Sequence, residues 1–140
     1  MTIYLTIQFV LLVGAVIIGI YNAWVGMSRA GMWTFPRRRH QVLGIIFFSL
    51  ILIVFLIGLF SFPSLRRLRI RIPGYLGLSW LIFLLSLIGM VLGIIRSQKK
   101  TILSRYKRIE STTATLHPWP IILATGLSFA QIFNLLNRLF

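Results

Sequence analysis

Two histidines are the side chains in this sequence best suited to hold a metal or a pigment. His40 ends the run RRRH and His117 begins the run HPWP, and each lies just before a hydrophobic stretch. Two imidazoles from different helices could ligate a haem, and one could ligate another pigment metal, but such ligands are generally set within a span. Both runs are typical of a membrane interface. We therefore interpret the pair as ordinary interfacial histidines and predict no cofactor and no metal site.

Other groups that do chemistry are scarce. The chain has one carboxyl side chain, Glu110, and no cysteine, so it offers neither a carboxylate pair nor a thiolate. No glycine loop of the phosphate-binding kind is present. The long hydrophobic runs contain no Asp, Glu or Lys of the sort that proton-coupled transporters place within the membrane. These observations predict a protein that is not an enzyme.

The elements that position the histidines are hydrophobic runs long enough to span a membrane. Of the 140 residues, 58% are hydrophobic, and the run from Val42 to Phe62 carries no charge, whereas a spanning helix needs about 20 apolar residues. Short connections make consecutive spans antiparallel. We predict an all-α integral membrane protein, a single membrane domain over 1–140, with four transmembrane helices in an antiparallel bundle joined by short basic connections. The expected spans are 3–25, 42–62, 75–95 and 119–136.

The fourth run is the least apolar, because a polar side chain recurs at every third position from Thr125 to Asn137. Steps of three drift around a helix, so these side chains cover much of its circumference. Buried amides need partners, which favours a helix that faces protein on more than one side. Alternatively Asn134 and Asn137 already lie at the interface, or the run is re-entrant or lies along the membrane surface.

Basic residues fall between the runs. The connections after the first and third runs contain four and six of them, while the second connection has four and the C-terminal tail has one. With both termini on the non-cytoplasmic side, ten basic residues face the cytoplasm and five do not, which obeys the positive-inside bias. This orientation leaves the second connection on the translocated side, unless one outer run fails to span.

These connections are the expected binding surfaces. Fifteen Lys and Arg against a single acid require anions from elsewhere, and their spread around membrane helices does not suit nucleic acid. Arginine pairs well with carboxylate and phosphate, and basic residues near a membrane attract anionic lipids. The expected partners are acidic surfaces of other membrane subunits or anionic lipids, and the alternative is a connection with no specific partner. The candidate residues are Arg37, Arg38, Arg39, Arg66, Arg67, Arg69, Arg71, Lys99, Lys100, Arg105, Lys107 and Arg108.

Small residues predict close helix contacts. GMVLG sets Gly89 and Gly93 on one helix face, and Ala15 and Gly19 form a weaker pair in the first run. We expect these two pairs to pack against each other. The full set of candidate packing residues is Ser86, Gly89, Gly93, Ser128, Gln131 and Asn134. Tyr75 is expected in an interfacial aromatic belt.

High basicity, missing chemical groups and helix faces that need neighbours together predict a non-catalytic accessory or structural subunit of a larger multisubunit membrane complex. Respiratory and photosynthetic complexes commonly contain such small subunits. The alternative is a small homo-oligomeric transporter or channel whose basic rims attract solutes.

Overall fold

Four long helices make up the described part of the chain. The computed structural model describes residues 2–27, 37–67, 72–102 and 116–139, with side chains at 3–26, 38–60, 74–95 and 116–137. The helices are α1 (Thr2–Met27), α2 (Arg37–Arg67), α3 (Ile72–Ile102) and α5 (Pro118–Leu139), and no strand occurs among the described residues. All four are long and apolar enough to cross a membrane. The predicted all-α, four-helix fold is confirmed, and the chain is an integral multi-pass membrane protein.

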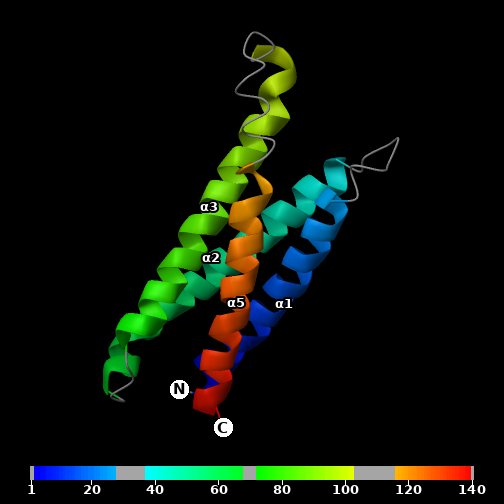
Figure 1. The fold of residues 1–140 in the computed structure, drawn as a ribbon. Helices are drawn as coiled ribbons and strands as arrows, with labels where there is room; N and C mark the ends of the chain where they lie inside the picture. The colour runs from blue at the N-terminus through cyan, green and yellow to red at the C-terminus, as the bar shows by residue number, and fades with distance from the viewer. Residues whose placement is uncertain (1, 28–36, 68–71, 103–115, 140) are drawn as a thin grey trace.

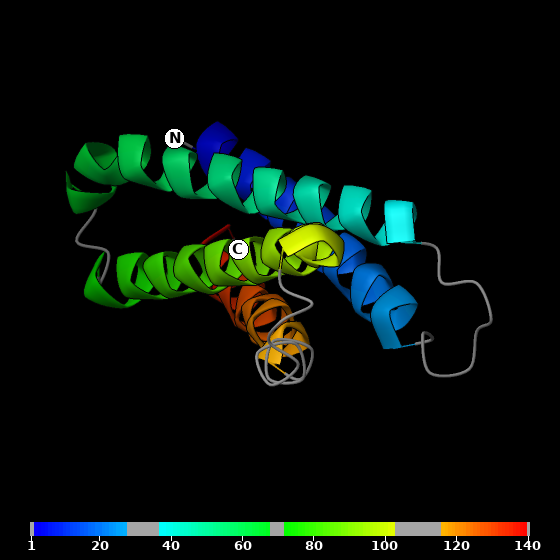
Figure 2. The ribbon, with the colours of Figure 1, turned by 90° about the horizontal axis from the view of Figure 1, so that it is seen from above.

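The helices form a ring. α1 packs against α2 and α5, and α3 packs against the same two helices, so α1 faces α3 and α2 faces α5 across the bundle axis. Consecutive helices run in opposite directions, which brings the N-terminus and the C-terminus to the same end (Figure 1). Seen from above, α2 and α3 lie side by side, and α5 lies on the other side of α3 (Figure 2).

Each helix buries one stripe and exposes the rest. The buried positions recur every three or four residues, as expected for one face of an α-helix. The central layers contain Leu12, Ala15, Phe47, Ile51, Ile82, Ala124 and Leu135. Large apolar side chains such as Ile3, Ile17, Phe60 and Phe133 are exposed. An apolar exterior of this kind is stable in contact with the hydrocarbon chains of lipids, which surround a membrane-spanning bundle.

The ring corrects one expected contact. We predicted that Ala15 and Gly19 would pack against Gly89 and Gly93, and this is wrong. A Cβ atom added at Gly19 would lie 2.9 Å from a ring carbon of Phe47 in α2, and one added at Gly89 would lie 2.6 Å from a side-chain carbon of Ile121 in α5. Both close approaches are to ring neighbours, because α1 and α3 occupy opposite corners.

The fourth hydrophobic run forms a helix that lies beside the others for its whole length (Figure 1). Its buried stripe includes Thr125, Ser128 and Gln131, while Asn134 and Asn137 are exposed. This packing does not fit a re-entrant or surface-lying segment. The buried polar side chains of α5 face the interior of this bundle. Asn134 and Asn137 face outward, where they contact lipid, the membrane interface or a neighbouring protein.

Candidate functional site

The histidines predicted as interfacial meet inside one end of the bundle, opposite the termini. His40 lies in the first turn of α2, and His117 directly precedes α5. Their ring centroids are 5.9 Å apart and their planes are almost perpendicular, at 88°. His117 is 8% exposed and His40 is half-buried. The two rings therefore come from helices that face each other across the bundle, and at least one of them is an interior residue.

Glycines make room for both rings. A Cβ atom added at Gly26 of α1 would lie 3.2 Å from Cε1 of His40, and one added at Gly93 of α3 would lie 3.1 Å from Cε1 of His117. Any larger residue at either glycine would press on an imidazole. Each histidine thus packs against a glycine of a neighbouring helix, and all four helices contribute to what we call the histidine end.

The environment of His117 orients its ring and keeps it neutral. Burial lowers the pKa of His117, the nearby His40 lowers it further, and a hydrogen bond to the backbone of Gly89 acts in the opposite direction. Its Nδ1 atom is buried without a hydrogen-bond partner. A neutral imidazole with one nitrogen fixed by the backbone has a lone pair to offer at the other.

A further buried polar side chain lies one turn deeper. Asn22 of α1 is 1% exposed, and its Oδ1 has no hydrogen-bond partner. The Nδ2 atom of Asn22 lies 3.6 Å from where a Cβ would stand on Gly44 of α2. Because Asn22 precedes Gly26 by four residues and Gly44 follows His40 by four, this contact forms the next layer below the Gly26–His40 contact.

The opposite half of the core is a second polar cluster, here called the amide end. The hydroxyl of Tyr75 in α3 donates a 2.6 Å hydrogen bond to Oε1 of Gln8 in α1. Nε2 of Gln8 in turn donates to the backbone carbonyl of Val54 in α2, at 3.4 Å. Gln8 is fully buried and Tyr75 is 4% exposed. This network links three helices, including the two that face each other across the ring.

Ser79 and Gln131 complete the amide end. Nε2 of Gln131 in α5 donates to the Ser79 hydroxyl at 3.2 Å, and that hydroxyl donates to the carbonyl of Tyr75 one turn earlier. Oε1 of Gln131 is buried without a hydrogen-bond partner. Both side chains line a small cavity whose other walls are apolar, formed by Leu12, Ile51, Val54, Phe55 and Ile82.

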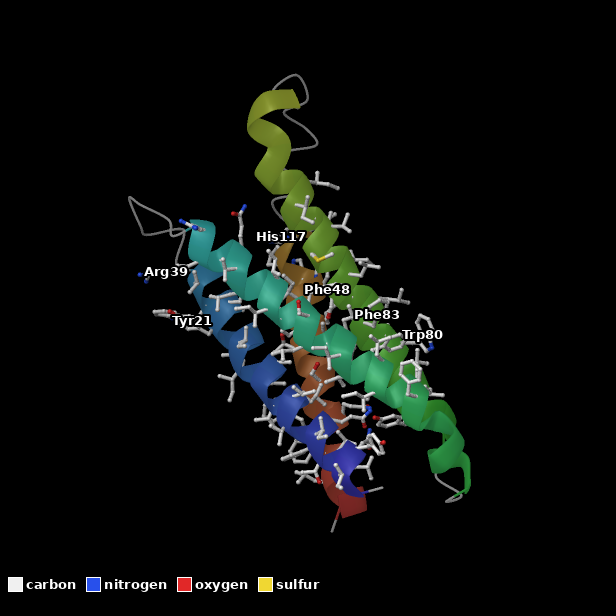
Figure 3. All side chains as sticks on the ribbon, turned by 180° about the vertical axis from the view of Figure 1, so that it is seen from behind. Tyr21, Arg39, Phe48, Trp80, Phe83 and His117 are labelled. Carbon is white, nitrogen blue, oxygen red and sulfur yellow. The ribbon has the colours of Figure 1, made fainter. Side chains whose placement is uncertain are left out.

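An aromatic seam lies on the side where α2 meets α3. Phe55 stacks on Phe83 at 4.6 Å between ring centroids and meets Trp80 edge-on at 4.7 Å, and Phe48 lies 6.1 Å from Phe83. Figure 3 shows Phe48, Phe83 and Trp80 along this seam, with Arg39 and His117 towards the histidine end. The seam holds α2 and α3 together by ring contacts.

The structure places the other predicted residues as follows. Arg38 and Arg39 are exposed at the start of α2, beside His40 in the chain, and Arg37 begins that helix. The backbones of Arg66 and Arg67 end α2, and those of Lys99 and Lys100 lie near the end of α3. Ser86, Gly89, Ser128 and Gln131 are buried, Gly93 is half-buried and Asn134 is exposed. Outside the described residues lie Arg69, Arg71, Arg105, Lys107 and Arg108.

Comparisons with protein-family models, curated proteins and solved structures found no match to this chain.

Sequence reasoning missed Gln8, Asn22 and the interior position of Tyr75. Tyr75 was expected in an interfacial belt, but its ring is buried and its hydroxyl bonds to Gln8. The signal that could have found this cluster is the presence of two amides, Gln8 and Asn22, in an otherwise apolar first run. Amides in a spanning helix seek hydrogen-bond partners on other helices.

Proposed function

We propose that this chain is a non-catalytic accessory subunit of a larger membrane complex, of the respiratory or photosynthetic kind. Its helices anchor it in the bilayer, and its basic connections contact acidic surfaces of neighbouring subunits or anionic lipids. The observation that carries the proposal is the charge imbalance. Fifteen Lys and Arg accompany one acid, Glu110, and the described residues include no carboxylate that could pair with the exposed Arg38 and Arg39.

The packing within this chain limits the surfaces to which partners could bind. The polar residues Thr125, Ser128 and Gln131 are buried within this chain, and Gly89 packs against Ile121. Helix faces that could have served a neighbour are thus used for the bundle itself. We therefore expect partners to contact the charged ends of the helices. Asn134 is an exposed polar residue of α5 that could also form a hydrogen bond with a neighbouring helix.

The proposed orientation puts both termini on the non-cytoplasmic side. The structure supports the relative placement, since both termini lie at one end (Figure 1). The connections with ten of the fifteen basic residues then adjoin the histidine end on the cytoplasmic side. A cysteine introduced at Gln41, which is exposed near the start of α2, should react with a membrane-impermeant maleimide in inside-out vesicles and not in intact cells. The reverse labelling pattern would overturn the orientation.

Native mass spectrometry of gently solubilised membranes tests the subunit proposal. The expected result is this chain in a hetero-complex, with a lower yield after Arg38→Gln together with Arg39→Gln. Gln41→Ala is the matched control, because it is exposed on the same helix end but removes no charge. A monomer without stable partners would contradict the proposal. A homo-oligomer alone would contradict it as well and would favour the transporter or channel alternative.

A further inference from the structure

We propose that His40 and His117 are the two axial ligands of a haem iron at the histidine end of the bundle. This inference does not rest on the proposed function, because it concerns a site within a single chain. It goes beyond the sequence-based interpretation, which placed both residues at the interface without a cofactor.

The placement of the two rings suits one metal between them. α2 and α5 face each other across the ring of helices, as ligands on opposite sides of an iron must. Imidazole–metal bonds of about 2 Å on both sides of one metal ion hold ring centroids about 6 Å apart. The observed spacing is 5.9 Å. The imidazoles now meet edge to face, and each must turn one nitrogen towards the iron when the porphyrin enters.

The surroundings of His117 resemble those of a ligand histidine. Such a residue donates one ring N–H to a backbone carbonyl or carboxylate, which fixes the ring, and binds the metal with its other nitrogen. His117 has a hydrogen bond to the backbone of Gly89, and its Nδ1 is buried with no hydrogen-bond partner. Gly26 and Gly93 let each imidazole lie against the backbone of a neighbouring helix, in a position that a bulkier side chain would exclude.

The donor set and the charge favour haem over a free metal ion. A structural zinc site takes four protein ligands, and a catalytic one takes three. Within the described residues no third His, Cys, Asp or Glu joins the pair. Haem iron needs two axial ligands, because the porphyrin supplies four nitrogens. A bare divalent cation would also be repelled by the basic residues at this end, whereas the haem propionates would be attracted.

Arg38 and Arg39 give the histidine end a positive charge that would attract those propionates. Both are exposed in the first turn of α2, one and two residues before His40, and so lie on other faces of the helix than the imidazole. Their expected contribution is long-range attraction and not direct binding. The apolar porphyrin edge would lie against helix side chains, and the charged edge would face the membrane interface. His117 and His40 would then complete a six-coordinate iron with no open position.

Hemin titration of the full-length, detergent-solubilised protein tests the proposal. The expected result is saturable, stoichiometric binding with the spectrum of a low-spin, bis-imidazole haem in both oxidised and dithionite-reduced protein. His40→Gln and His117→Gln should each abolish the low-spin spectrum and weaken hemin binding by at least about tenfold. Gln41→Ala is the matched control and should bind hemin as the wild type does.

A rescue variant separates ligation from folding. In His117→Gly, added imidazole should restore the low-spin spectrum, since the glycine leaves room for a free ligand in place of the side chain. Circular dichroism shows whether each variant remains helical. Hemin binding that is equal in the wild type and in the double variant His40→Gln/His117→Gln would overturn the proposal. So would copper or zinc binding that needs both histidines in a protein that takes up no hemin.

Discussion

The two ends of the core hold the same four helices together by different means. At the amide end, Gln8, Tyr75, Ser79 and Gln131 connect the helices through hydrogen bonds between side chains. At the histidine end, glycines let helices and rings approach closely, and two buried polar atoms, Nδ1 of His117 and Oδ1 of Asn22, have no hydrogen-bond partner.

This difference separates a structural cluster from a binding site. Most polar groups at the amide end have partners within the protein, so their contribution is to stability and helix register. At the histidine end, buried polar atoms without partners are costly unless something binds them. The contrast predicts that removing hydrogen bonds at the amide end lowers stability and leaves ligand binding intact, whereas replacing either histidine removes ligand binding.

The largest expected effect is from Gly89→Val, which tests whether close approach holds α3 to α5. A Cβ atom at residue 89 would lie 2.6 Å from Cγ1 of Ile121, and valine adds two methyl groups. Overpacking should lower the free energy of unfolding by about 1–3 kcal/mol, measured by denaturation in detergent micelles. Gly77→Val is the control on the same helix, because a Cβ there meets nothing within 4 Å. Equal losses in the two variants would contradict the close-packing account.

The next effect is from Tyr75→Phe at the amide end. It removes the 2.6 Å bond to Gln8 and leaves Oε1 of Gln8 buried without that donor. The expected cost is about 1 kcal/mol, seen as a lower thermal midpoint in the same micelles. Tyr4→Phe serves as the control, since Tyr4 is 58% exposed. If Tyr75→Phe leaves stability unchanged, the amide end is not a stabilising network.

Acidification should destabilise the haem-free protein through the histidine end. Burial holds the pKa of His117 below its unfolded value of 6.5. The unfolded chain therefore binds the proton more readily, and stability is full above about pH 6.5 and falls as the pH drops towards the folded pKa. When charged, His40 repels the same proton. Thermal midpoints from pH 8 to pH 5 should fall less in His117→Gln, and an unchanged slope would show that another group is responsible.

The smallest effect is expected from Gln131→Leu. This variant removes the 3.2 Å bond to Ser79 but also removes Oε1, which is buried without a partner. The Ser79 hydroxyl keeps its own hydrogen bond to the carbonyl of Tyr75, so the variant leaves no buried donor unpaired, and losing the unpartnered oxygen offsets losing one hydrogen bond. The thermal midpoint should stay near that of the wild type and above that of Tyr75→Phe. A loss larger than that of Tyr75→Phe would place the main stabilising bond at Gln131.

The sequence predicted the four helices because each hydrophobic run is long enough to span and the charges fall between runs. It did not predict the ring order, which depends on tertiary packing, so Gly19 and Gly89 were matched to the wrong partners. For the same reason the meeting of His40 and His117 could not be read from their positions. Each lies at the start of a helix, but their contact requires α2 and α5 to face each other across the bundle.

The burial of polar side chains was also hard to predict. Periodicity shows that Thr125, Ser128 and Gln131 share one broad face of α5, but a hydrophobic pattern does not say whether that face meets this chain or another. A tyrosine at the start of a helix, such as Tyr75, fits an interfacial belt as well as it fits a buried hydrogen-bond network. The partner Gln8, which decides between them, lies in a different helix.

Measuring thermal stability and hemin binding in the same two variants tests most directly whether the two ends of the core have different roles. Tyr75→Phe should lower the thermal midpoint by about a few degrees and retain the low-spin haem spectrum. His117→Gln should lose that spectrum, while its haem-free midpoint stays closer to the wild-type value than that of Tyr75→Phe. Hemin binding lost equally in both variants, or retained in His117→Gln, would contradict the assignment of ligand binding to the histidines and of a purely structural role to the hydrogen bonds of the amide end.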